Sequence, residues 1–239
     1  MRLNDPELVR REYGDGVAFA ERRKVFTSFL RGPNAADVAF EAVAERRPAR
    51  LLEVGCGGGE FAEWVIREVG AEVIALDLSA HMVERARARG VDARVGDVQE
   101  LSFDDREFGV VVANWMLYHV PDLNRGIAEL ARVLRPGGRL VAATFGEDNL
   151  RELWLLLGET DAPPHPFSRE NGEDALRRHF ARVERRDAQA EVIFPNAEAL
   201  RRYVGASIRR RHLVDRVPDL DRPFRARSSQ AVFVAEQSA

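Results

Sequence analysis

The chain has 239 residues, of which 45% are hydrophobic and 31% charged, with a formal net charge of -3. This composition is typical of a globular domain and excludes disordered and fibrous classes. The single cysteine, Cys56, excludes an internal disulfide and favours a reducing compartment, so we expect a cytoplasmic protein. No apolar run has the length of a signal peptide or a membrane span, so we expect no membrane partner.

The N-terminal 46 residues read as a helical cap. Apolar residues between 7 and 30 recur at roughly helical spacing, broken by Gly14 and Gly16, and predict two short helices. A further helix is expected over 34–45, before the first apolar strand.

Residues 47–146 alternate between strands and helices and form the predicted cofactor-binding half. The strands are continuously apolar, which indicates burial on both faces of a parallel sheet with right-handed crossovers. We predict that Pro136, Gly137 and Gly138 end a helix and turn the chain into a strand. The expected strands are 50–55, 71–77, 91–96, 108–114 and 138–145, and the helices are 59–69, 80–89 and 122–134.

Residues 147–239 form the predicted substrate-side half, with an arginine-rich flap at 195–228. Residues 176–227 hold 14 Arg and 7 acidic residues, so this stretch is basic. The pattern predicts one domain over 1–239 and no second core. Its fold is α/β, a doubly wound, mostly parallel seven-stranded sheet. The remaining helices are expected at 148–158, 168–180 and 197–204, and the remaining strands at 182–194 and 230–236.

A glycine-rich loop follows the first strand and reads Glu53-Val-Gly-Cys-Gly-Gly-Gly-Glu60. Glycines allow positive φ angles and let a ligand approach the backbone. A dinucleotide-binding loop would have a third glycine at position 60. The acid found there would repel a pyrophosphate at the helix N-terminus. The loop therefore predicts a ligand without phosphates, which disfavours a nicotinamide oxidoreductase.

An acid followed by G-x-G-x-G resembles the first signature of the class I S-adenosylmethionine-dependent methyltransferases. The resemblance covers about residues 47–146 and implies that S-adenosyl-L-methionine is the cofactor. It implies cofactor contacts from Glu53, Gly55, Gly57 and Gly59. A plain tight turn is the alternative for the glycines.

Two acidic positions after the next strands strengthen the resemblance. Asp77 ends a strand, where a carboxylate can accept hydrogen bonds from both ribose hydroxyls, and Leu78 can cover an adenine face. The alternative for Asp77 is a helix cap, but Ser79 is better placed for that. Asp97 and Val98 resemble the family position that contacts the adenine ring, with an Asp-containing turn as the alternative.

The segment 114–122 resembles the small-molecule methyltransferases of ubiquinone biosynthesis. In that group this position faces the methionine part of the cofactor and the methyl acceptor. The resemblance implies a cofactor contact from Asn114 and makes His119 a candidate general base, with packing as its alternative. Tyr13 resembles an N-terminal tyrosine that closes over the cofactor, or else packs its ring.

The sequence thus predicts methyl transfer to a small-molecule acceptor by in-line displacement, without a metal. Oxygen, nitrogen and carbon acceptors all stay open, as does the oligomeric state. An RNA methyltransferase is an alternative because residues 176–227 are basic, but they lack interleaved aromatics and make nucleic acid an improbable partner. A regulatory protein that binds the cofactor without turnover is the other alternative. We further predict that the flap is a lid that orders on ligand binding.

Overall fold

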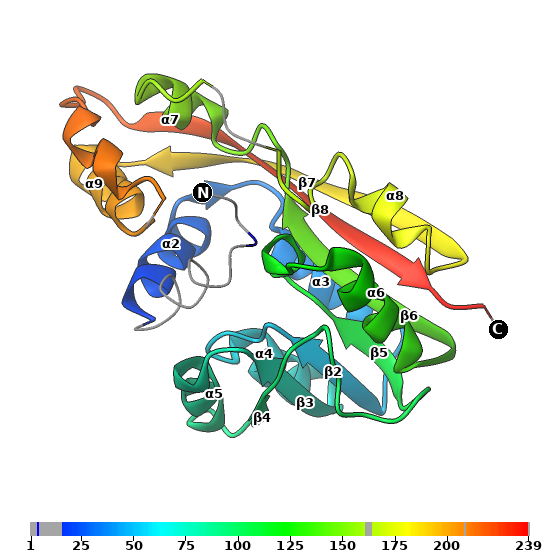
Figure 1. Cartoon of the computed structure of the whole chain (residues 1–239). Coiled ribbons are helices and arrows are strands. Elements are labelled where there is room, and N and C mark those ends of the chain that lie inside the picture. Colours follow the sequence, from blue (N-terminus) through cyan, green and yellow to red (C-terminus); the bar gives the residue numbers. More distant parts are fainter. Residues whose placement is uncertain (1–3, 5–15, 161–163, 208, 239) are drawn as a thin grey trace.

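One twisted sheet with helices on both faces makes up the protein, as a computed structural model of residues 4, 16–160, 164–207 and 209–238 shows (Figure 1). The strands are β1 (Leu30–Arg31), β2 (Arg50–Val54), β3 (Glu72–Asp77), β4 (Asp92–Val95), β5 (Phe108–Val112), β6 (Leu134–Phe145), β7 (Arg182–Phe194) and β8 (Phe224–Glu236). The helices are α2 (Val17–Ser28), α3 (Ala35–Ala44), α4 (Glu60–Val69), α5 (Ala80–Arg87), η1 (Leu117–His119), α6 (Leu123–Arg132), α7 (Arg151–Leu156), α8 (Gly172–Leu176), α9 (Ala197–Gly205) and η2 (Arg211–Arg216). None of the helices in these described ranges is long and apolar enough to cross a bilayer.

The strand order is β1-β7-β8-β6-β5-β2-β3-β4. The five strands from β4 to β6 are mutually parallel, and β8 is antiparallel to both β6 and β7. The predicted doubly wound, mostly parallel sheet is confirmed. The strand count was one too low, because Leu30 and Arg31 pair with β7 at the edge of the sheet. A strand of two residues is too short to show an alternating pattern.

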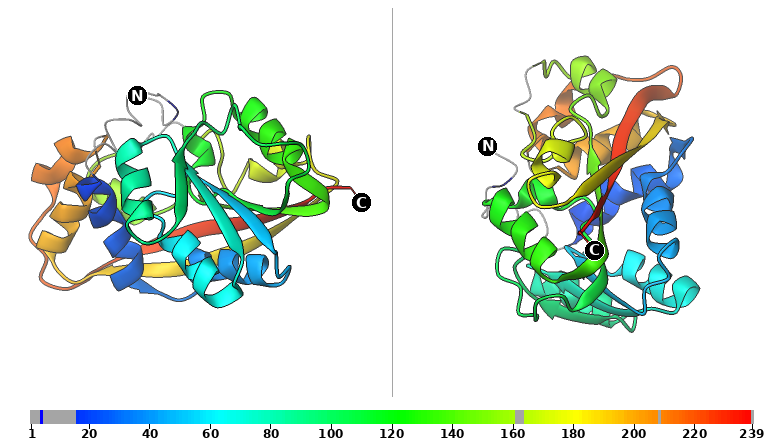
Figure 2. Two further views of the ribbon diagram at one scale, coloured as in Figure 1. Left: turned by 90° about the horizontal axis from the view of Figure 1, so that it is seen from below. Right: turned by 90° about the vertical axis from the view of Figure 1, so that its right-hand side faces the viewer.

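Strand residues are buried on both faces, which explains their continuous apolar sequence. In β2, Leu51 packs into the cluster beneath α3 and α4, whereas Leu52 packs into the cluster that contains Ile127 and Leu130 of α6. Alternate residues of a strand point to opposite faces, so consecutive leucines reach different cores. Figure 2 shows α3 and α4 on one side of the sheet and α6 on the other.

A third hydrophobic cluster lies where the long antiparallel pair of strands β7 and β8 extends beyond the parallel strands. It joins Val25 of α2, Leu153 of α7, Tyr203 of α9 and Leu213 of η2. The sequence predicted no second core, whereas this cluster is packed separately from the two clusters that flank the parallel strands. Residues 195–228 contribute α9, η2 and the start of β8 to this packed cluster, so the described part of the predicted flap has its own buried contacts.

Two strands begin earlier than predicted. Strand β8 begins at Phe224, opposite Phe194, because the polar run from 225 to 230 pairs with β7 although it lacks a strand-like apolar pattern. Strand β6 begins at Leu134, and residues 135–138 form a bulge between its pairing with Phe108 and the later register. The proline and glycines there interrupt the pairing inside a strand instead of separating a helix from a strand.

Helices α7 and α8 are shorter than predicted. Helix α7 covers 151–156 because Leu150, with φ 55°, lies in the left-handed region and cannot continue a helix. Helix α8 covers 172–176 of the predicted 168–180. Of the two N-terminal helices expected over 7–30, the described residues contain α2 from 17 to 28.

Candidate functional site

The carboxyl ends of four parallel strands bring the predicted site residues to one edge of the sheet. Glu53 and Asp77 lie near the ends of β2 and β3, and Asp97 and Asn114 each come two residues after β4 and β5. The strand order reverses between β5 and β2. Such a switch point opens a crevice at the carboxyl edge and is where α/β sheets bind ligands.

The glycine loop between β2 and α4 depends on two positions where a side chain would collide. Gly55 has φ 68°, and a Cβ built on it would lie 2.6 Å from Cβ of Met116. Gly59 has φ 79°, and its Cβ would lie 2.7 Å from Cβ of Ala86 on α5. These contacts bring the loop close to the segment after β5 and to α5, which shapes the crevice.

Asp77 is fixed by the backbone on both sides. Its Oδ2 accepts from the N–H of Gly57 at 2.9 Å, and its Oδ1 accepts from the N–H of Ser79 at 2.8 Å. Burial raises its pKa, while these two bonds oppose the shift. Ser79 caps α5 by accepting from the N–H of Met82, as expected. Leu78 is 56% exposed, which leaves an apolar face beside the carboxylate for a planar group.

Glu53 is a buried acid, and one of its carboxyl oxygens has no hydrogen-bond partner. It is 3% exposed, and its Oε2 has no hydrogen-bond partner. Burial, followed by the carboxylates of Glu60 and Asp77, raises its pKa to about 8, although the N–H of Ala62 donates to it. The Glu53 carboxyl is therefore mostly protonated at neutral pH, and a cation bound beside it would favour its ionised form.

Asn114 lies next to Glu53 in the sheet order and is also unsatisfied. It is 9% exposed, and neither its side-chain oxygen nor its nitrogen has a partner. Buried polar atoms are nearly always paired, and an unpaired amide costs free energy. A ligand with both hydrogen-bond donors and acceptors would satisfy Asn114.

Asp97 already makes local hydrogen bonds. Its Oδ1 accepts from the N–H of Gln99 at 2.8 Å, and the amide of Gln99 lies 3.0 Å from its other oxygen. The Asp-containing turn given as its alternative is therefore present. Val98 is 6% exposed, and its contact with a ligand stays a prediction.

Glu60 has two basic partners, which weakens the charge argument made from the sequence. Its Oε1 lies 2.7 Å from Nη1 of Arg23 and 3.0 Å from Nη2 of Arg89. The site is therefore not negative enough at Glu60 to exclude phosphates on that ground alone.

Aromatic rings line the segment that follows β5. Trp115 has φ 52°, a strained angle for a bulky residue, and its Nε1 donates to Oε1 of Gln230 at 3.0 Å. Its ring lies 6.4 Å from that of Phe145, which in turn lies 5.7 Å from Phe26 of α2 and 6.1 Å from Tyr118. These four rings, the aromatic cluster, pack one against the next from the end of β5 to the cap.

Two histidines flank Tyr118. The ring of His119 lies 4.4 Å from the Tyr118 ring, and that of His165 lies 6.2 Å away. The Nδ1 atom of His165 is buried and has no partner, and burial lowers the pKa of this imidazole. His165 is thus a neutral base with an unpaired ring nitrogen, beside the Tyr118 ring.

Part of the chain that forms this arrangement is similar to known proteins. Residues 52–142 match the family described as "Methyltransferase domain". Over these residues the chain is similar to methyltransferases. A malonyl-[acyl-carrier protein] O-methyltransferase of Methylococcus capsulatus is 32% identical over 181 residues, which cover 66% of this chain and 64% of the relative.

Other similar proteins are also described as methyltransferases. A ubiquinone biosynthesis O-methyltransferase of Xanthomonas oryzae pv. oryzae is 43% identical over 104 residues, which cover 41% of this chain and 43% of the relative. These matches span less than two thirds of the relatives' lengths. The fold is shared with a Thermotoga maritima structure described as a SAM-dependent methyltransferase, with a TM-score of 0.62, 19% identity and coverage of 96% and 100%.

The residues of the crevice fit S-adenosylmethionine as a ligand. Glu53 and Asn114 offer unsatisfied polar atoms for an ammonium group, Asp77 offers a fixed carboxylate for hydroxyls, and Leu78 offers an apolar face for a base. Within the described ranges, no three His, Cys, Asp or Glu side chains lie close enough together to hold a metal ion.

Sequence reasoning missed several residues of the site. His165 and Gln230 lie far from the predicted motifs, and no local pattern links them to Trp115 or Tyr118. Cys56 is buried in the core, and burial raises the pKa of its thiol, which agrees with a packing role. Tyr13 lies outside the described residues.

Proposed function

We propose that this chain transfers a methyl group from S-adenosylmethionine to a small-molecule acceptor. The observation that carries the proposal is the pair of buried, unsatisfied side chains, Glu53 and Asn114, at the switch point of the sheet. Buried polar atoms are nearly always paired, so these two side chains indicate a place where a bound molecule completes hydrogen bonds. The similarity to methyltransferases supports S-adenosylmethionine as that molecule.

Each residue at the crevice has a distinct binding role in this proposal. Asp77 accepts from the ribose hydroxyls, and Leu78, Asp97 and Val98 form the adenine end. Glu53 and Asn114 bind the ammonium group of the amino-acid part. The backbone of Gly55, Gly57 and Gly59 gives the close approach. When bound, the cofactor supplies a methyl group already activated on a sulfonium.

In this proposal the acceptor lies beside the aromatic cluster of Trp115, Phe145, Tyr118 and Phe26. These rings exclude water and hold an apolar body in a fixed orientation, which is the main requirement for in-line displacement. The names of the relatives above specify O-methyltransferases, which supports oxygen as the accepting atom.

A histidine beside Tyr118 removes the acceptor's proton in this proposal. His119 was the candidate from the sequence, and it lies in η1 at the end of β5. His165 is a second candidate because its Nδ1 is buried and unpaired. An imidazole with a lowered pKa is neutral at pH 7, which is the state that accepts a proton.

Ion pairing argues against nucleic acid as the acceptor. Arginines between 176 and 227 pair with acids from several elements, so much of the basic charge of this stretch is compensated locally. The pairs are Arg177–Glu173, Arg185–Asp187, Arg186–Glu45, Arg201–Asp219, Arg202–Glu198, Arg210–Glu159, Arg225–Glu191 and Arg227–Asp148.

A labelled-methyl assay tests the proposal. The protein is incubated with S-adenosylmethionine carrying a tritiated methyl group and with pools of hydroxylated and carboxylated small molecules, and products are separated by chromatography. We expect label in one small-molecule pool and matching formation of S-adenosylhomocysteine. Tight cofactor binding with no transfer to any pool would instead support the regulatory alternative, and label in added RNA would support the RNA alternative.

A cytoplasmic location stays a prediction from the single cysteine.

A further inference from the structure

An ion pair connects helix α2 to the glycine loop. Nη1 of Arg23 lies 2.7 Å from Oε1 of Glu60, the first residue of α4. The side chain of Glu60 lies over the loop, because a Cβ built on Gly58 would be 3.0 Å from both carboxylate oxygens. Glu60 therefore holds a carboxylate next to the backbone that the cofactor must approach.

The space beside this ion pair is large and basic. A cavity of about 240 Å³ lies between α2, the first turn of α4 and the last turn of α5, lined by Arg23, Lys24, Thr27, Glu60 and Arg85, together with Ala20. Three cations and one carboxylate make it favourable for an additional anion. The charge of Arg23 also acts inside the crevice, where it lowers the pKa of Glu53.

A zwitterionic ligand needs an acidic partner for its ammonium group and a basic partner for its carboxylate at this site. The carboxyl groups of Glu53, Glu60 and Asp77 favour the ammonium and sulfonium groups of S-adenosylmethionine but repel its carboxylate. An α-amino acid carries ammonium and carboxylate on neighbouring atoms. If Glu53 binds the ammonium, a cation near both Glu53 and the N-terminus of α4 must bind the carboxylate, and Arg23 meets both conditions.

We infer that Arg23 binds the carboxylate of the cofactor, and that Glu60 occupies this place until the cofactor arrives; the inference rests on the proposed function. Binding exchanges one carboxylate for another at the same guanidinium. Glu60 keeps Arg89 as its partner, so the exchange leaves no charge unpaired. The side chains of Arg23 and Glu60 are 42% and 20% exposed, so solvent screens this ion pair and its contribution to stability is small.

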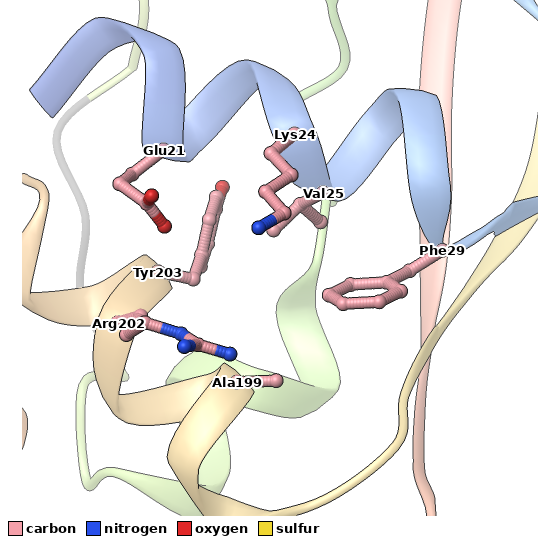
Figure 3. A pocket seen from close by; sticks show the side chains of 7 residues that line it. All are labelled: Glu21, Lys24, Val25, Phe29, Ala199, Arg202 and Tyr203. Carbon is pink, nitrogen blue, oxygen red and sulfur yellow. The ribbon is translucent and has the colours of Figure 1, made fainter. Parts of the chain in front are cut away.

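The exchange does not require α2 to leave the protein. The neighbouring Arg22 donates to the carbonyl of Ala206 at the end of α9, at 2.7 Å. Figure 3 shows Val25 of α2 and Tyr203 of α9 facing each other across this seam, where the remaining cavity is about 10 Å³, room for one water. Helix α2 is thus anchored on α9 while Arg23 changes partner.

The test compares two ligands that differ only in the carboxylate. Isothermal titration calorimetry measures binding of S-adenosylhomocysteine and of its decarboxylated analogue, 5′-S-(3-aminopropyl)-5′-thioadenosine. The wild-type protein should prefer S-adenosylhomocysteine, and Arg23→Met should weaken its binding about tenfold while the analogue binds as before. Lys24→Met, which removes the adjacent cation, should keep the preference.

Glu60→Gln gives a second, opposite result. Removing the competing carboxylate should strengthen binding of S-adenosylhomocysteine and weaken binding of the cationic analogue. The inference is overturned if Arg23→Met changes both ligands equally or neither, or if Glu60→Gln weakens S-adenosylhomocysteine. Failure of the wild-type protein to bind either nucleoside is a different outcome, which would remove the proposed function together with the inference.

Discussion

Binding of S-adenosylhomocysteine should expel a proton from Glu53. In the free protein the pKa of Glu53 is about 8, so at pH 7 about nine in ten molecules carry the proton. The ligand's ammonium group stabilises the ionised carboxylate and lowers this pKa. At pH 7 the protein should therefore release up to about one proton per ligand, and the association constant should rise by up to about tenfold per pH unit between pH 6 and 8.

Calorimetry measures the released proton directly. Titrations at pH 7 in phosphate and in Tris give different heats because these buffers have different ionisation enthalpies, and the difference gives the number of protons. Glu53→Gln is the matched control, since it keeps the shape of the side chain but cannot ionise. It should release no proton from this site. Equal proton release by the wild-type protein and the variant would refute the assignment of Glu53.

The same group makes the folded protein less stable as the pH rises. The pKa of Glu53 is raised above its ordinary value of 4.5, so the folded state binds more protons than the unfolded state between about pH 4.5 and 8. The free energy of unfolding should fall across this window, by an amount on the order of 4 kcal/mol if Glu53 acted alone. In Glu53→Gln the fall should be smaller, as urea denaturation at pH 5 and pH 8 can measure.

Four further substitutions test the rest of the site. Asp77→Ala removes the acceptor of two ribose hydroxyls, at roughly 1.5–3 kcal/mol per charge-assisted bond, so affinity for S-adenosylhomocysteine should fall at least about tenfold in calorimetry; unchanged affinity excludes Asp77. Gly55→Ala places a Cβ 2.6 Å from Met116 at φ 68°, so it should lower the thermal midpoint and weaken cofactor binding; a variant that melts and binds normally contradicts the loop geometry. For a general base, His119→Ala or His165→Ala should lower turnover about 10²–10⁴-fold with cofactor affinity retained; less than about tenfold in both folded variants leaves alignment and desolvation as the mechanism.

The parallel half of the sheet and its binding edge follow from local sequence. The apolar run at Leu51 and Leu52 ends in glycines, and Asp77 follows the next apolar run, so strand, loop and acid are adjacent in the chain. Their register across β2, β3 and β5 is then set by the fold itself. The strand, the loop and the acid are each formed by residues that are close together in the sequence, so the sequence predicts them.

The remainder depends on contacts between distant segments. Strand β8 begins at Phe224 because β7 provides a partner for a polar stretch, and nothing within that stretch indicates a strand. Arg23 meets Glu60, and His165 meets Tyr118, only after the sheet has assembled. The sequence shows Glu60 as an acid at the start of a helix, but it does not show that Arg23 and Arg89 pair with it.

A crystal structure with bound S-adenosylhomocysteine tests the central claim most directly, because the claim is that Glu53 and Asn114 are unsatisfied in order to bind this molecule. The account predicts that the ligand's amino group lies within hydrogen-bond distance of both side chains and that its ribose hydroxyls donate to Asp77. A nucleoside bound elsewhere, with Glu53 and Asn114 still lacking a ligand partner, would contradict the account.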